Sequence, residues 1–170
     1  MLPEFTLRIE TDDDEPGAWR FTLERSDGLG RLDASDVEPD VRGERLALLT
    51  LVRGLEALDQ PSRVALTAAS RYLRHGVETE MLEWQAAGWV WESYGRMVPV
   101  KHADLWQRVV RASEFHELRV GPSPRSRDRR YRVDGRHGGV ASRSVLRRIA
   151  SLASFGGAKR MESSRIADRT

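Results

Sequence analysis

Residues 99–109 read PVKHADLWQRV and open a stretch with the apolar spacing of a helix. Leu105, Val109 and Ala112 recur at intervals of four and three residues, which predicts an amphipathic helix over residues 104–115. Two further segments with clear patterns precede it. They are GERLALLTLVRGLEAL at residues 43–58 and VALTAASRYL at residues 64–73. The first has the spacing of a longer helix, and the second indicates a short buried strand followed by a helix that Ser70 caps.

The remaining elements follow from apolar periodicity and from turn residues. Alternating apolar residues predict two strands joined by the acidic turn TDDDEPG, and the Gly-, Asp- and Pro-rich residues 26–43 hold a weak third strand. We expect strands over residues 5–9, 19–23, 63–67 and 118–120, and helices over residues 44–58, 71–74, 78–87 and 104–115. This order is typical of an α/β or α+β protein with a mixed sheet.

The charge is distributed unevenly along the 170 residues. Residues 1–120 hold 15 lysines and arginines against 22 acids, a net charge of −7, whereas residues 121–170 hold 13 against 4, a net charge of +9. We therefore predict an acidic domain over residues 1–120. Residues 121–170 are predicted to form a basic Arg-rich loop, an amphipathic helix and a tail, or to complete the last helix of the domain.

The composition also excludes several classes of site. The chain has no cysteine, which excludes disulfides, a thiol nucleophile and a thiolate zinc site. Its four histidines have no i,i+4 pair, so no histidine metal cluster is indicated. No window reaches the roughly 18 apolar residues of a membrane span. We expect a soluble, cytoplasmic monomer that does not bind membranes.

The three central segments resemble the type-1 ribonuclease H family over about residues 4–120. Members of that family read similarly to P-V-K-N-x-D-L-W in the third segment, and here His102 stands where Asn is usual. The resemblance implies a five-stranded mixed sheet flanked by helices. It also implies cleavage of the RNA strand of RNA/DNA hybrids by two Mg²⁺ ions that four carboxylates hold.

Most of those carboxylates are missing from this chain. Asp12, in Thr11-Asp12-Asp13, matches the first of them and is the remaining candidate ligand. Ala47 stands at the Glu position of the first helix, and Ala69 stands at the Asp position of the second segment. The fourth ligand is an Asp on the last helix, but residues 135–161 contain no acid.

Glu44 lies one helical turn before Ala47 and is a possible substitute ligand. A turn spans about 5.4 Å, more than the roughly 3.5–4 Å that separates paired catalytic metals. We therefore expect no cofactor, and Mg²⁺ only if the chain is an active enzyme.

The resemblance implies that nucleic acid is read through the minor groove. The residues in matching segments are Ser70, Arg71, Lys101, His102 and Trp106. The basic tail adds arginines able to neutralise phosphates, among them Arg127, Arg129, Arg130 and Arg132. Helix capping by Ser70 and core packing by Trp106 are the alternative roles of those two residues. The aromatic residues Trp84, Trp89, Trp91 and Tyr94 lie in or beside an acidic stretch, residues 78–92, and are interpreted as core or partner contacts.

The sequence thus predicts a catalytically degenerate ribonuclease H-like protein that binds RNA/DNA hybrid or structured RNA without cleavage. Two alternatives stay open. The first is an active hybrid endonuclease with a nonstandard metal site at Asp12. The second is a protein-interaction module on a retired enzyme fold.

Overall fold

A five-stranded mixed sheet forms the centre of the computed structural model, which describes residues 1–12 and 14–122. Its strands, in the spatial order β3-β2-β1-β4-β7, are β1 (Glu4–Thr11), β2 (Ala18–Arg25), β3 (Arg31–Val37), β4 (Arg63–Ala68) and β7 (Glu117–Val120). Antiparallel pairing joins β1 to β2 and β2 to β3, whereas β4 runs parallel to both β1 and β7. The predicted fold class is confirmed.

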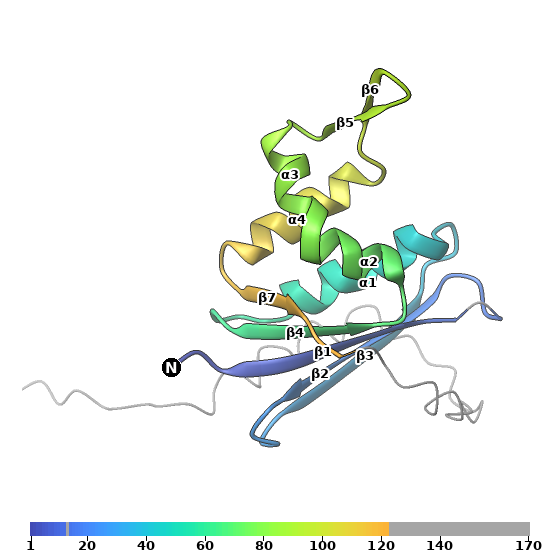
Figure 1. Ribbon diagram of the computed structural model, residues 1–170. Helices are drawn as coiled ribbons and strands as arrows, with labels where there is room; N and C mark the ends of the chain where they lie inside the picture. Colours follow the sequence, from blue (N-terminus) through green and yellow to red (C-terminus); the bar gives the residue numbers. More distant parts are fainter. Residues whose placement is uncertain (13, 123–170) are drawn as a thin grey trace, which may run out of the picture.

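All the helices that the structure describes lie on one face of this sheet (Figure 1). They are α1 (Gly43–Glu56), α2 (Arg71–His75), the π-helical η1 (Gly76–Glu80), α3 (Met81–Ala86) and α4 (Ala103–Ser113). Each predicted helix is confirmed within a few residues. None of the described helices has the length and apolar character that a membrane crossing requires. Residues 123–170, with the predicted Arg-rich loop, amphipathic helix and tail, lie outside the described residues.

The core forms where α1 packs on β1. Leu7 and Ile9 alternate with exposed residues and point toward the helices, as the period of a strand requires. Gly54 of α1 lets the helix approach closely, because a Cβ there would come within 2.6 Å of Leu7 Cδ1. Burying a leucine such as Leu51 or Leu55 contributes about 1.5–3 kcal/mol. The apolar stripe of α1 is therefore the surface by which this helix packs on the sheet.

A second small sheet was not predicted. Strands β5 (Val90–Ser93) and β6 (Arg96–Pro99) form a hairpin that projects from the helical layer (Figure 1). Tyr94 and Gly95 connect them with φ angles of 50° and 74°, which is the conformation of a two-residue hairpin turn. The hairpin carries mostly exposed side chains, so its sequence lacks the alternating pattern of a half-buried strand.

Trp106 of α4 joins four elements of the helical layer. Its side chain is fully buried, and its indole Nε1–H donates to Tyr72 Oη of α2 at 2.7 Å. The ring meets the ring of Trp84 of α3 edge to face, with 5.4 Å between the centroids. On another side it lies directly against Gly76 of η1, where any Cβ would overlap the indole. A glycine is required there by Trp106.

Gly76→Ala is predicted to destabilise the protein. The added methyl group must displace Trp106, and such overpacking typically costs about 1–3 kcal/mol. Gly30→Ala is a matched control, because the nearest side-chain atom would lie 3.8 Å from its Cβ. Urea unfolding of the two variants measures the difference, and equal stability of both would contradict the packing described here.

Candidate functional site

The carboxyl ends of β1 and β4 lie side by side at one edge of the helical layer. Ile9 pairs with Ala68 in the parallel register, so the register continued by one residue sets Glu10 beside Ala69. Ala47 is buried on the first half of α1. The structure thus has methyl groups at two of the positions where carboxylates were sought.

Asp12 follows β1 directly and shapes the connection to β2. Its backbone N–H donates to Ala18 O at 3.3 Å, and its Oδ1 accepts the backbone N–H of Asp14 at 2.8 Å. The carboxylate therefore has a role in closing the turn. Sequence reasoning did not single out Glu10, whose place beside Ala69 follows only from the register of the two strands.

Glu44 belongs to the first turn of α1 and pairs across to the segment before α4. Its Oε2 accepts a hydrogen bond from Lys101 Nζ at 2.8 Å, which raises the pKa of the ammonium group. Within residues 1–12 and 14–122, no three histidine or acidic side chains are grouped closely enough to hold a metal ion. The donor set of this part of the chain does not fit a carboxylate-bridged Mg²⁺ pair, which needs several ligands at octahedral spacing.

Arg45 makes the second contact between the two helix starts. Its guanidinium donates to both carboxylate oxygens of Asp104, at 3.0 and 2.7 Å, and lies 3.4 Å from His102 Nδ1. The hydrogen bond from Arg45 lowers the pKa of Asp104. Burial, followed by the charges of Arg45 and Lys101, lowers the pKa of His102 and favours its neutral form. The helix starts are therefore joined by two ion pairs.

The other predicted site residues divide into exposed and structural groups. Arg71 at the start of α2 is exposed and makes no ion pair within the described part of the chain. Ser70 caps α2, because its Oγ accepts the Leu73 N–H at 3.3 Å. Trp106 has no exposed surface and packs in the core. Its indole N–H donates to Tyr72, whose own hydroxyl donates to Lys101 O at 3.0 Å. Arg127, Arg129, Arg130 and Arg132 lie outside the described residues.

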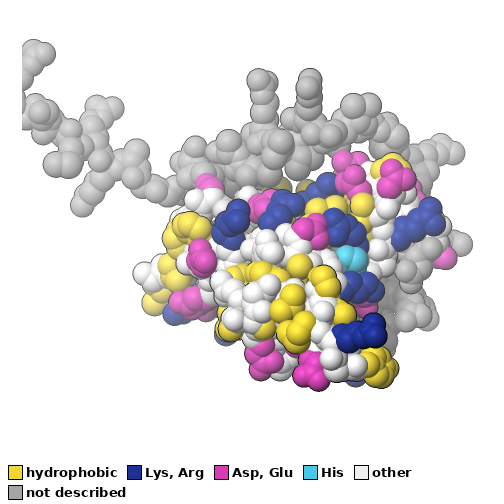
Figure 2. Space-filling view, turned by 90° about the horizontal axis from the view of Figure 1, so that it is seen from above, with side chains coloured by type: hydrophobic (Ala, Val, Ile, Leu, Met, Phe, Trp, Pro, Cys, Tyr) yellow, Lys and Arg dark blue, Asp and Glu magenta, His cyan; other side chains and the backbone are white. Residues whose placement is uncertain are grey.

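The hairpin and α3 form an aromatic and acidic projection, defined here as residues 78–97. Figure 2, which looks down on this end of the molecule, shows hydrophobic side chains gathered together with acidic side chains around them. The exposed apolar residues are Leu82, Trp91, Tyr94 and Met97. Four acids, Glu78, Glu80, Glu83 and Glu92, accompany a single basic residue, Arg96. Of the aromatic residues within residues 78–97, Trp84 and Trp89 are partly buried against the core.

Comparison with known proteins tests whether the chain belongs to the ribonuclease H family. The chain is 34% identical to the ribonuclease H of Paracoccus denitrificans over 107 residues, which are 61% of this chain and 67% of that protein. The chain belongs to the ribonuclease H family. It is also 32% identical to the ribonuclease H of Rhodopirellula baltica and 38% identical to that of Halorhodospira halophila, in each case over 61% of this chain. These alignments span only 65% and 66% of the two relatives.

Solved structures support the same fold. LC9-RNase H1, described as a type 1 RNase H with the type 2 active-site motif, matches with a TM-score of 0.54 and 22% identity over 71% of this chain and 64% of its own. A foamy viral protease-reverse transcriptase in complex with RNA/DNA hybrid matches with a TM-score of 0.53 and 13% identity over 72% of this chain and 17% of its own. At such identities the likeness concerns the fold alone. No family model matches the chain.

In the ribonuclease H motif that this chain resembles, Asn is usual where His102 stands. The backbone at His102 is left-handed, with φ 58° and ψ 35°, and it begins α4. Asn, Asp and His are the non-glycine residues most often found in this conformation. The substitution therefore preserves the backbone of the helix start while it exchanges an amide for a neutral imidazole.

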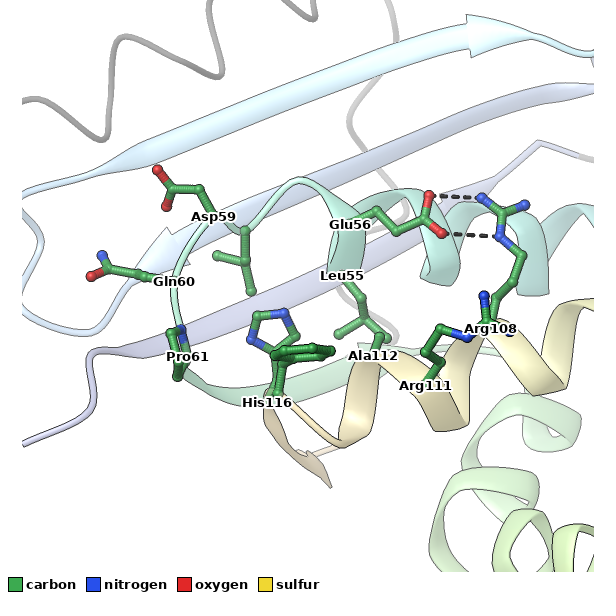
Figure 3. Close-up of a pocket in the computed structure, with 11 residues that line it drawn as sticks. Leu55, Glu56, Asp59, Gln60, Pro61, Arg108, Arg111, Ala112 and His116 are labelled. Atoms are coloured by element: carbon green, nitrogen blue, oxygen red, sulfur yellow. Dashed lines mark hydrogen bonds and ion pairs between the residues drawn. The ribbon is translucent and has the colours of Figure 1, made fainter.

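A pocket of about 380 Å³ lies at the opposite ends of α1 and α4 (Figure 3). Leu55, Leu58 and Ala112 contribute its apolar lining, and the Glu56–Arg108 ion pair lies at its edge. His116 also lines it and is only 7% exposed, and its Nδ1 atom has no hydrogen-bond partner among residues 1–12 and 14–122. Burial lowers the pKa of His116.

This burial predicts an acid sensitivity. In the unfolded chain His116 regains an ordinary pKa of about 6.5, so the unfolded state takes up the proton first as the pH falls. The stability that the neutral side chain confers is present above that pH and is lost as the pH falls toward the lowered folded pKa. Chemical unfolding at about pH 7.5 and pH 5 is expected to show a larger loss for the wild type than for His116→Leu, and parallel losses would contradict this.

Proposed function

We propose that this ribonuclease H-like chain binds an RNA/DNA hybrid or structured RNA without cutting it. The observation that carries the proposal is the pair Ala47 and Ala69, which stand where the family motif has a Glu and an Asp. A methyl group contributes neither charge nor a lone pair to Mg²⁺, whose chemistry in this family depends on carboxylate ligands. The described scaffold is retained although two of its ligand positions are apolar.

Binding is supported by the basic residues around the helix starts. Arg71 and Lys101 are exposed, and both belong to segments that match the family motif. A-form helices present a wide, shallow minor groove whose 2′-hydroxyls and phosphates accept hydrogen bonds from such groups. The arginines of residues 125–136 would add phosphate contacts and therefore affinity.

A protein partner is the second candidate function. The aromatic and acidic projection exposes large apolar side chains, which on soluble proteins often mark interaction sites. Its acids would repel phosphate and favour a basic partner. A chain that fails to bind nucleic acid at low salt would favour this function over the first.

The incomplete carboxylate set predicts that the chain does not cleave a hybrid. Incubated with a labelled RNA/DNA hybrid and Mg²⁺ or Mn²⁺, the wild-type chain is expected to leave the RNA strand intact, because its carboxylate set is incomplete. Release of RNA fragments that Asp12→Ala abolishes would establish the active-enzyme alternative. Fragments that persist in Asp12→Ala would indicate a contaminating nuclease or a different site, and a repeat purification separates these two cases.

The affinity of the chain for hybrid is expected to depend on the salt concentration. The wild type is expected to bind hybrid at about 50 mM salt and to weaken steeply as salt increases, because each phosphate contact contributes roughly 0.9 to the slope of log affinity against log salt. Replacing Arg127, Arg129, Arg130 and Arg132 by Gln should lower that slope by up to about 3.6. Fluorescence anisotropy across a salt series measures it.

A variant of equal net charge controls for bulk electrostatics. It replaces Arg143, Arg147, Arg160 and Arg165 by Gln and should retain most of the slope. Equal losses in both variants would show diffuse attraction in place of contacts by the Arg-rich segment.

A further inference from the structure

The basic side chains at the helix starts are held by acids of the same cluster. We name the four side chains Glu44, Arg45, Lys101 and Asp104 the paired-charge cluster. Lys101 Nζ lies 2.8 Å from Glu44 Oε2, and Arg45 lies 2.7 Å from Asp104 Oδ2. Each pair joins the first turn of α1 to the start of α4.

The formal charges of the cluster cancel. Two cations face two anions, so an approaching phosphate meets no net positive charge from them. All four side chains are accessible to solvent, with Lys101 68% exposed and Asp104 58% exposed. Exposed ion pairs are weak because water screens both partners, and a phosphate is able to compete for each cation.

We propose that Glu44 and Asp104 are internal competitors for phosphate and limit the affinity of this surface for nucleic acid. The inference rests on the proposed binding function. When Lys101 turns to a phosphate, the Glu44 carboxylate loses its partner and stays near the new anion. Removing that carboxylate ends both the competition and the repulsion, and the same reasoning holds for Asp104 and Arg45.

The chain contains a control ion pair farther along the same helices. Arg108 of α4 donates to both carboxylate oxygens of Glu56 of α1, at 2.9 and 2.7 Å. This pair has comparable exposure, 41% and 48% for the two side chains. It borders the pocket of Figure 3. Glu56 lies at the end of α1, about 18 Å along the helix from Glu44, whereas Arg108 lies about one turn after Asp104. Glu56→Gln therefore removes one negative charge and one ion pair at a distance from the cluster.

The test measures the affinity of the full chain for a labelled RNA/DNA hybrid at about 50 mM salt. Glu44→Gln and Asp104→Asn are expected to bind about three- to tenfold more tightly than the wild type, from the loss of one nearby negative charge. Glu56→Gln should stay within about twofold of the wild type. Urea unfolding confirms that all three variants fold.

A double-mutant cycle shows whether Glu44 acts through Lys101. Lys101→Gln should weaken binding, and adding Glu44→Gln to it should give a smaller gain than Glu44→Gln gives in the wild type, because repulsion is relieved but no competition for Lys101 is left to remove. A full gain from Glu44→Gln without Lys101 would overturn the proposed competition. Equal gains from Glu44→Gln and Glu56→Gln would overturn it as well.

The outcomes separate this inference from the binding function itself. Hybrid binding by the wild type, unchanged in Glu44→Gln and Asp104→Asn, overturns the inference and leaves the function. Binding by these variants and not by the wild type supports the inference and shows that the native chain does not itself bind the hybrid. An absence of binding in every variant overturns both.

Discussion

The contact of Trp106 with Gly76 and Tyr72 is the constraint on which the helical layer depends. The indole fills the space that a side chain at residue 76 would need, and its N–H finds its hydrogen-bond acceptor in the Tyr72 hydroxyl. Tyr72 in turn donates to the carbonyl oxygen of Lys101. One buried side chain thus ties α2, η1 and α4 together and positions the backbone that precedes α4.

The charge pairing at the helix starts follows from that arrangement. Because the start of α4 is held beside α1, Lys101 and Asp104 come within ion-pair distance of Glu44 and Arg45. In the family motif that this chain resembles, carboxylates stand at the positions of Ala47 and Ala69. Here Ala47 is buried one turn after Glu44 on α1, and Glu44 and Asp104 pair with cations of the protein itself.

Local patterns predicted most of the fold, and the exceptions have physical reasons. The stripe of α1 and the alternation of β1 identify buried faces, since both periods report burial directly. The hairpin of β5 and β6 escaped because its residues are mostly exposed and carry no such period. The place of Glu10 beside Ala69 also escaped, since it depends on the register between strands more than fifty residues apart. For Trp106 the sequence left nucleic-acid contact and core packing open, and its burial against Gly76 and Tyr72 follows only from the fold.

The amino-acid sequence by itself determined the order of elements and the family motif, and it predicts alanines, Ala47 and Ala69, at two carboxylate positions of that motif. These are properties of residue type and spacing along the chain. Tertiary structure alone decided which charges meet. Lys101 and Glu44 are separated by 57 residues, and the packing of α4 on α1 brings them to 2.8 Å. Electrostatic interactions depend on distance in space, so the pairing of these charges became visible only in the folded chain.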